Sequence, residues 1–191
     1  VVSINPLEET AMKRFKHPQN PLHLIGRGVQ IADEHLPVRI GGDAALLQGF
    51  AKTILSQGGA DLDFISANTL GFEDWKKHIE STDWEKIVEQ SGISRDRIEK
   101  TGNAIAKSER MIVCWAMGLT QHENSVAVIQ EVSNLLLAGG HFGKPGAGAC
   151  PVRGHSNVQG DRTVGVNHNP TEDFISSCES ETGINMPRKK G

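Results

Sequence analysis

Cysteine is scarce in this chain, and its few copies stand far apart. Cys114, Cys150 and Cys178 form no CxxC pair, and no histidine lies at zinc-finger spacing from them. Structural zinc and four-cysteine iron–sulfur sites need clustered ligands, so we assign no metal ligand within the chain and expect no disulfide framework. Reduced thiols in the cytoplasm fit this pattern best. Cys114 stands in an apolar run, where we expect a small buried side chain.

The sequence also lacks an excess of charge and any long apolar run. Its net charge is -3 and its pI is close to 6.3, so no overall positive field attracts nucleic acid or an anionic membrane. The longest apolar runs, 111–117 and 135–138, are far shorter than the roughly 20 residues of a membrane-spanning helix. The first residues, VVSINPLEE, lack the features of a signal peptide. We expect no nucleic-acid partner and no membrane span.

What is present is an alternation of strand and helix patterns. Residues 1–4 are predicted to be the end of a buried strand, closed by the turn signal Asn5-Pro6. Residues 7–38 are predicted to be mostly connection, and the prolines of HPQNP at 17–21 exclude a continuous helix there. A short extended piece at 38–42 precedes a helix that starts at Asp43 and ends at Gly58-Gly59.

The second half of the pattern has the same character. Helices are predicted over 63–81 with a break at Gly71, over 84–89, over 94–107 and over 125–138, and a buried strand over 111–116. The order indicates an α/β fold with a parallel sheet flanked by helices. Two clear strands are too few for a whole sheet, and the chain opens within one, so we expect an internal piece of a larger protein.

Three loops are predicted to meet at one edge of this sheet. They start at Asn5, at Gly41-Gly42-Asp43 and at Met117, and each follows a strand pattern. Ligands of open α/β sheets bind at this edge, near helix N-termini. Asp43 can cap its helix or accept hydrogen bonds from a guanine, and the cap is the favoured reading for the residue alone. Gly118, Gln121 and His122 can face solvent or line a pocket, and their position slightly favours the pocket.

The most unusual stretch is residues 139–166, with eight glycines and two prolines. Within it, the positively charged Arg153 is followed by hydrogen-bonding groups on a slender backbone, including Gly154, His155 and Asn157. This composition suits a large, flat, polar ligand. A flexible linker is the alternative, but four spaced valines favour an ordered loop with packed anchors: Val152, Val158, Val164 and Val166. A nicotinamide site is rejected, because the GAGACPVRG segment neither follows the first strand nor opens a helix.

These motifs resemble the large subunit of molybdenum oxidoreductases that bind two molybdopterin guanine dinucleotides, the DMSO reductase family. The resemblance is carried by MGLTQHENS at 117–125, LLLAGG at 135–140 and, most specifically, CPVRGHSNVQGDRT at 150–163. INPLEE, IGGDAALLQGF and FISANTLGFEDW fit in the same order. The branch that the chain resembles most is the one similar to the formate dehydrogenase alpha subunit. The resemblance implies a Rossmann-like nucleotide-binding portion within domains similar to domains 1–3 of these enzymes.

The resemblance implies a cofactor, bis-molybdopterin guanine dinucleotide with molybdenum or tungsten, and assigns residues to it. Asn5, Gly41 and Asp43 are expected at the nucleotide end of one tail, and Met117, Gly118, Gln121 and His122 beside its phosphates or pterin. Cofactor contacts are also expected from the glycine-rich stretch, at Gly146, Gly148, Gly154 and Asn157. The metal ligand and any iron–sulfur cluster are expected outside this chain. The isolated chain is therefore expected to be inactive.

The resemblance also implies a reaction and its partners. Arg153 is expected to face a small anionic substrate such as formate, because a planar guanidinium orients a carboxylate bidentately. His155 replaces the glutamine of authentic formate dehydrogenases, and Gly140-His141 replaces a Gly-Asn turn. An electron-transfer subunit is a further expected partner. A non-catalytic remnant of such a subunit and a generic nucleotide-binding α/β module are the alternatives.

The expected domain plan has three parts. Residues 1–139 form the nucleotide-binding portion, 140–170 form the cofactor and active-site loop, and 171–191 connect to the next domain.

Overall fold

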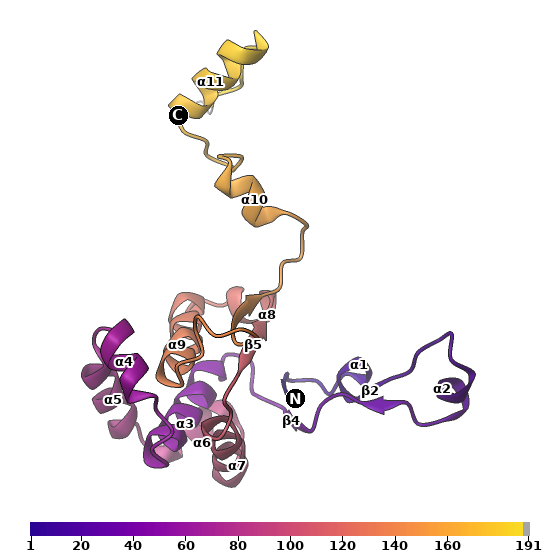
Figure 1. Cartoon of the computed structure of the whole chain (residues 1–191), viewed down its shortest axis with the longest axis vertical. Helices are drawn as coiled ribbons and strands as arrows, with labels where there is room; N and C mark the ends of the chain where they lie inside the picture. The colour runs from indigo at the N-terminus through magenta and orange to yellow at the C-terminus, as the bar shows by residue number, and fades with distance from the viewer. Residues whose placement is uncertain (189–191) are drawn as a thin grey trace. The chain divides into compact units, whose positions relative to one another are not determined.

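The structure, a computed structural model, describes residues 1–188, and the side chain of Leu24 is outside the description. The chain divides into two compact units, residues 1–151 and the residues from 152 onward (Figure 1). The boundary falls inside the stretch 140–170, which was expected to act as one loop. The three-part division by function stays a prediction, and its last three residues lie outside the described part.

The first unit is built around a central helix, α3 (Asp43–Ser56). Apolar residues at helical spacing make most of its surface buried, including Leu46, Phe50 and Ile54, which are at most 2% exposed. It packs against α5 (Phe72–Ser81), α6 (Trp84–Ser91), α7 (Arg95–Ala106) and α9 (Ser125–Ala138), while α4 (Leu62–Asn68) lies on α9. These helices match the sequence predictions, including the break at Gly71, which adopts a left-handed conformation with φ 76°.

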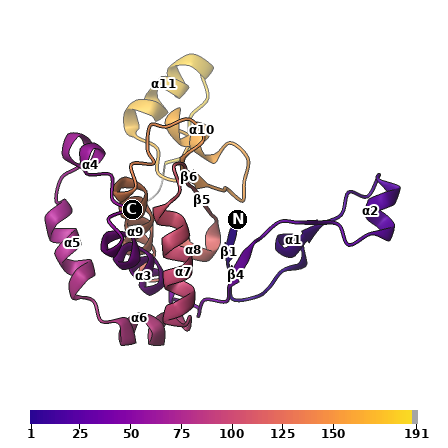
Figure 2. The ribbon, with the colours of Figure 1, turned by 60° about the horizontal axis from the view of Figure 1, so that its bottom comes forward.

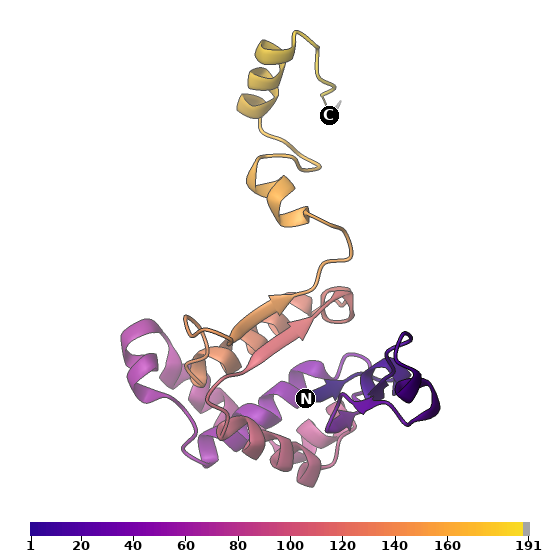
Figure 3. The same ribbon diagram turned by 45° about the vertical axis from the view of Figure 1, so that its right-hand side comes forward.

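Four strands of this unit form two small parallel sheets that carry the helices on one side. β1 (Val2–Ile4) pairs with β4 (Glu34–Leu36), and β5 (Ile112–Trp115) pairs with β6 (Gly148–Pro151), as Figure 3 shows for the second sheet. The predicted α/β class with parallel strands and flanking helices is thus confirmed.

Two details of the strand predictions are wrong, and one strand was not predicted. The extended piece expected at 38–42 contains no strand, and the partner of β1 is β4, whose sequence EHL has no apolar pattern. β1 and β5 were expected to be buried, but Ile4 is 40% exposed and Ile112 is 55% exposed. The reason is that each sheet has only two strands and helices on one face, so alternate side chains point to solvent.

Residues 10–30, expected to be mostly connection, form a small hairpin with helical turns (Figure 2). β2 (Arg14–Phe15) pairs antiparallel with β3 (Val29–Gln30); α1 (Thr10–Lys13) precedes the first strand and α2 (Pro21–Ile25) lies between them. The prolines of HPQNP do not exclude α2, because Pro21 occupies its first turn, where no amide donor is needed. Asn20 caps this helix by accepting a hydrogen bond from the Leu22 amide at 3.0 Å.

The second unit contains α10 (Val158–Thr163) and α11 (Glu172–Thr182). Three of the four valines expected to anchor an ordered loop are exposed, Val152, Val164 and Val166 at 53%, 66% and 55%, while Val158 is half-buried. The glycine-rich stretch at 139–166 is partly regular structure. It contains β6, which belongs to the first unit, and α10, which belongs to the second. Within residues 1–188, no helix has both the length and the apolar character needed to cross a membrane.

Candidate functional site

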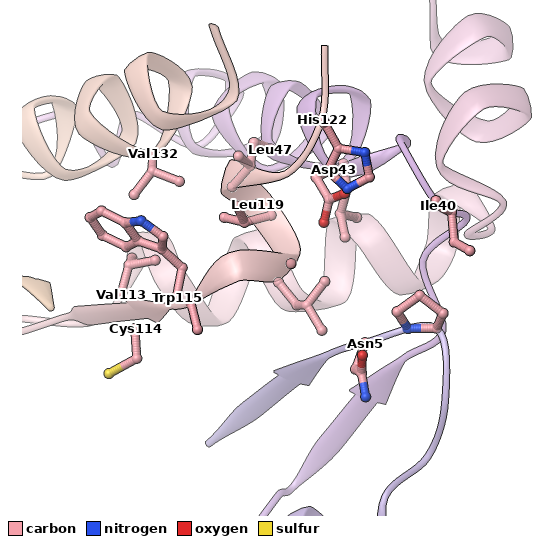
Figure 4. A pocket seen from close by; sticks show the side chains of 15 residues that line it. Asn5, Ile40, Asp43, Leu47, Val113, Cys114, Trp115, Leu119, His122 and Val132 are labelled. Carbon is pink, nitrogen blue, oxygen red and sulfur yellow. The ribbon is translucent and has the colours of Figure 1, made fainter. Parts of the chain in front are cut away.

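A pocket of about 510 Å³ lies in the first unit where the three predicted loops meet (Figure 4). Asn5 follows the end of β1, Asp43 begins α3, and Gly118 and His122 follow the end of β5. Parallel α/β folds place ligands at the carboxyl ends of their strands. The convergence of these loops on one hollow, predicted from the order of elements, is therefore present in the structure.

Asp43 presents its carboxylate to the pocket and does not cap its helix. Gly42 is the N-cap residue of α3, and no side chain caps the first turn. The favoured reading of Asp43 as a cap is therefore wrong. The pKa of the Asp43 carboxyl is raised mainly by burial, although its own backbone amide and the nearby His122 act in the opposite direction. A half-buried carboxylate with no other side-chain hydrogen bond in the described residues is suited to accepting donors from a ligand.

Gly42, which precedes Asp43, has a structural role in packing. A Cβ atom built on Gly42 would collide with the backbone carbonyl of Gln90 and come within 2.9 Å of the Ser91 Cα atom. The close approach of backbone that a glycine permits here is therefore between α3 and the end of α6.

Asn5 and His122 supply the other polar side chains at the rim. The Asn5 amide nitrogen donates to the Leu7 carbonyl at 2.8 Å, which fixes the side chain and leaves its oxygen as an acceptor. His122 follows the short helix α8 (Met117–Thr120), which was not predicted. Gly118 lies in α8, and a Cβ atom built on it meets nothing within 4 Å. The backbone at Gly118 thus borders open space.

The floor of the pocket is apolar, and sequence reasoning did not find it. Val113 and Trp115 project from β5 toward Val132 of α9, with Leu47 of α3 and Leu119 of α8 beside them (Figure 4). Because these residues are apolar, the sequence predicts them as part of the hydrophobic core. The spacing of apolar residues does not distinguish a core from the floor of a pocket. An apolar floor with a few polar groups at the rim is typical of small-molecule and cofactor sites.

Several predicted cofactor residues of the first unit do not line this pocket. Gly41, Met117 and Gln121 are exposed beside it, and the Gln121 amide contacts the Met117 sulfur at 3.7 Å. Gly146 and Gly148 lie before and within β6, both with positive φ. Their roles toward a cofactor stay predictions.

In the second unit, Arg153, Gly154 and His155 are exposed, and among residues 1–188 no carboxylate forms an ion pair with Arg153. Asn157 has φ 60° and precedes α10, where its amide donates to the Asp161 carboxylate at 3.2 Å. Asn157 therefore has a local structural role. The substrate role of Arg153 and the cofactor roles of Gly154 and Asn157 stay predictions.

Cys114 is exposed, which corrects the expectation of a buried side chain. It lies on the open face of the β5–β6 sheet, because odd and even positions of a strand face opposite sides. In the part of the chain that the structure describes, no group of three or more His, Cys, Asp or Glu side chains is arranged to hold a metal ion.

Comparison with known proteins agrees with this geometry. The family model described as molybdopterin oxidoreductase matches residues 1–186. Protein YdeP of Escherichia coli K12 is 40% identical over the whole chain, which covers 27% of YdeP, and formate dehydrogenase H of the same organism is 32% identical over 72% of the chain and 19% of its own length. The solved structure of acetylene hydratase from Pelobacter acetylenicus superposes with a TM-score of 0.60 at 23% identity, over 76% of this chain and 18% of that one. The chain thus spans about a quarter or less of these relatives.

Proposed function

The chain belongs to the molybdopterin oxidoreductase family, and on that premise we propose that its pocket holds the guanine-nucleotide end of a bis-molybdopterin guanine dinucleotide cofactor. The observation that carries this proposal is the convergence of Asn5, Asp43 and His122 on one hollow at the ends of β1 and β5. A guanine presents two adjacent N–H donors on one edge. The Asp43 carboxylate, which does not cap its own helix, can accept hydrogen bonds from both of them.

The residues of the pocket fit a nucleotide in size and in chemistry. A volume of about 510 Å³ lies within the usual range for small-molecule sites, roughly 300–1,000 Å³. The first turn of α3 has no side-chain cap, so its free amides and the positive end of the helix favour phosphate groups. The open space at Gly118 lets a ligand approach the backbone. The pterin and metal are expected to extend beyond this pocket.

We further propose that the full-length protein is a formate dehydrogenase-like oxidoreductase. The relative named formate dehydrogenase H and the CPVRGHSNVQGDRT motif support this assignment. When bound, the metal–pterin group, with molybdenum or tungsten, supplies the capacity to accept two electrons. Arg153 holds a small anionic substrate such as formate through paired hydrogen bonds from its guanidinium. His155, two residues after Arg153 in the same motif, is proposed to contact the same substrate.

The remaining parts of the proposal concern the protein around this chain. The metal ligand, any iron–sulfur cluster and the contact with an electron-transfer subunit belong to segments outside the chain. The protein is proposed to act in the cytoplasm, where thiols remain reduced.

The proposed nucleotide site is tested by Asp43→Asn in the full-length protein, expressed in a host that makes the cofactor. Asparagine keeps the size of the side chain but presents an amide with only one acceptor oxygen and no charge. We expect guanine-nucleotide content per protein, measured by release and chromatography, to fall severalfold. The matched control is Asp96→Asn, because Asp96 also lies in the first turn of a helix, α7, but is exposed outside the pocket. Equal losses in the two variants would assign Asp43 a helix-stabilising role only.

Metal and pterin analysis of the same full-length protein separates the two alternatives. A non-catalytic remnant or a generic nucleotide-binding module predicts no molybdenum, no tungsten and no pterin after expression in a competent host. The proposed oxidoreductase predicts pterin and metal in a ratio of about two to one.

A further inference from the structure

The open face of the β5–β6 sheet carries two cysteines side by side. The strands are parallel and in register, with Cys114 paired to Cys150. Both cysteines are exposed. Figure 4 shows the Cys114 sulfur on the opposite side of β5 from the side chains of Val113 and Trp115, which face the helices. Since paired residues of parallel strands project to the same side, the Cys150 thiol stands on the same face.

We propose that Cys114 and Cys150 form a binding site for a soft monovalent cation, Cu(I), held between their two sulfur atoms. This proposal does not depend on the proposed nucleotide function, although the Cys114 residue also contributes to the lining of the pocket.

The spacing of the two side chains favours a bridging ion over a disulfide. In-register neighbours on parallel strands have nearly parallel Cα–Cβ bonds, so their Cβ atoms are separated by about the strand spacing, 4.7–4.9 Å. A disulfide needs Cβ atoms about 3.5–4.5 Å apart. Metal–sulfur bonds of about 2.3 Å place two sulfurs up to about 4.6 Å apart across one ion. The sheet therefore accommodates the ion without a shift of either strand, whereas a disulfide requires the strands to move.

The number of ligands selects the class of ion. Zn²⁺ sites in proteins use three or four protein ligands, and within residues 1–188 these cysteines belong to no group of three or more potential metal ligands. Thiolates prefer soft ions, and Cu(I) and Ag(I) are stable with two sulfur ligands in a line. The kind of ligand excludes Ca²⁺ and Mg²⁺, which require oxygen ligands.

Proton release accompanies binding. The pKa of the Cys114 thiol is raised, first by burial and then by Cys150, so the unliganded thiol is protonated at neutral pH and is a weak nucleophile. Binding replaces two S–H protons with one Cu(I): two thiols and one Cu(I) give a bis-thiolate complex of net charge about -1 and two protons. No electrons are transferred in this step.

The test is Cu(I) binding by the full-length protein in competition with a chromophoric Cu(I) chelator, without oxygen. We expect Cys114→Ser, Cys150→Ser and the double variant each to lose the same single equivalent of bound Cu(I), because either thiol alone makes a poor site. Cys178→Ser is the matched control, since Cys178 is the third cysteine of the chain and lies in the second unit. It is expected to keep that equivalent.

A second measurement uses the unaltered protein, so that it stands even if a variant fails to fold. One equivalent of Ag(I) is expected to protect Cys114 and Cys150 together from iodoacetamide, as read by mass spectrometry of their peptides. The proposal is wrong if Ag(I) protects neither or only one of them, or if Cys178→Ser loses as much Cu(I) as Cys114→Ser. It is also wrong if glutathione disulfide readily links Cys114 to Cys150 while Ag(I) leaves both reactive, because the pair would then be a redox pair.

Discussion

At the scale of single residues, His141 shows how a side chain acquires a role that only its surroundings define. It is 2% exposed, and its Nδ1 atom has no hydrogen-bond partner among the described residues. A Cβ atom on Gly139 would collide with the imidazole, and the left-handed turn falls on Gly140, with φ 60°. Sequence reasoning noted only that an asparagine was replaced at this turn. Because Gly140 adopts the left-handed conformation of the turn, the following position does not need an asparagine, and His141 buries its imidazole ring there.

The pKa of His141 makes stability depend on pH. Burial lowers this pKa most, the charge of Lys144 lowers it further, and Asp61 opposes them. Because the folded pKa lies below the unfolded value of about 6.5, the unfolded state binds more protons at low pH. The stabilisation is complete above about pH 6.5 and is lost progressively as the pH falls below that value. We expect the Tm of the wild-type protein to fall more steeply between pH 7.5 and 5.5 than the Tm of His141→Gln.

The matched control for this prediction is His168→Gln, which removes an exposed histidine of the second unit. Its pH dependence should follow that of the wild type. A wild-type slope equal to that of His141→Gln would mean that the buried imidazole contributes nothing to acid sensitivity.

At the scale of elements, helices follow from the sequence more completely than strands do. The apolar spacing of α3, α7 and α9 predicts both their extents and their buried faces. Strand β4 was missed because EHL has neither alternation nor β-branched residues, and it is a strand only because β1 lies beside it. The pairing of β2 with β3 was missed because two-residue strands are too short to show an alternation. Pairing with a distant segment is a tertiary property that local propensity does not contain.

The contact between α3 and α7 is another tertiary property, and it depends on two glycines. A Cβ atom built on Gly102 of α7 would lie 2.6 Å from the Thr53 Cβ atom, and one on Gly49 of α3 would lie 2.7 Å from the Ile98 Cγ2 atom. Real Cβ atoms do not approach so closely, so at these points the backbone of each glycine packs directly against a side chain of the facing helix. The helix pattern predicts each helix but not this distance between them.

We therefore expect Gly102→Ala to destabilise the protein despite the better helix propensity of alanine. The propensity gain is about 1 kcal/mol, whereas overpacking a core typically costs about 1–3 kcal/mol. Because the obstructing atom is the Thr53 Cβ and not the tip of a flexible chain, the net loss should be about 1–2 kcal/mol. Thermal denaturation of the cofactor-free protein measures it. Gly118→Ala is the control, because its new methyl group meets no atom within 4 Å, and it should leave the Tm unchanged or slightly raised.

At the scale of the whole molecule, the chain corresponds to one part of its longer relatives. It spans 27% of YdeP and 19% of formate dehydrogenase H. The family was predictable from the sequence because CPVRGHSNVQGDRT combines a guanidinium, glycines and amides in an order that few proteins share. The pocket at Asp43 was predictable because the ends of parallel strands meet at one edge. The place of Arg153 relative to that pocket was not, because its unit is joined to the first by an exposed segment whose path no local pattern determines.

Arg153 is consequently tested in the full-length enzyme and not in this chain. If it orients a substrate anion, Arg153→Ala should lower kcat/KM by about 30- to 700-fold, because removing one partner of a charged hydrogen-bonded pair costs roughly 2–4 kcal/mol, while metal and pterin content stay near those of the wild type. Arg153→Lys should recover only part of the activity, since lysine keeps the charge but not the planar pair of donors. Arg162→Ala, which removes an exposed guanidinium from α10 of the same unit, should affect neither quantity. A parallel loss of activity and cofactor in Arg153→Ala would instead make Arg153 a residue that holds the cofactor or the fold, because an interaction with substrate alone leaves the loaded enzyme intact.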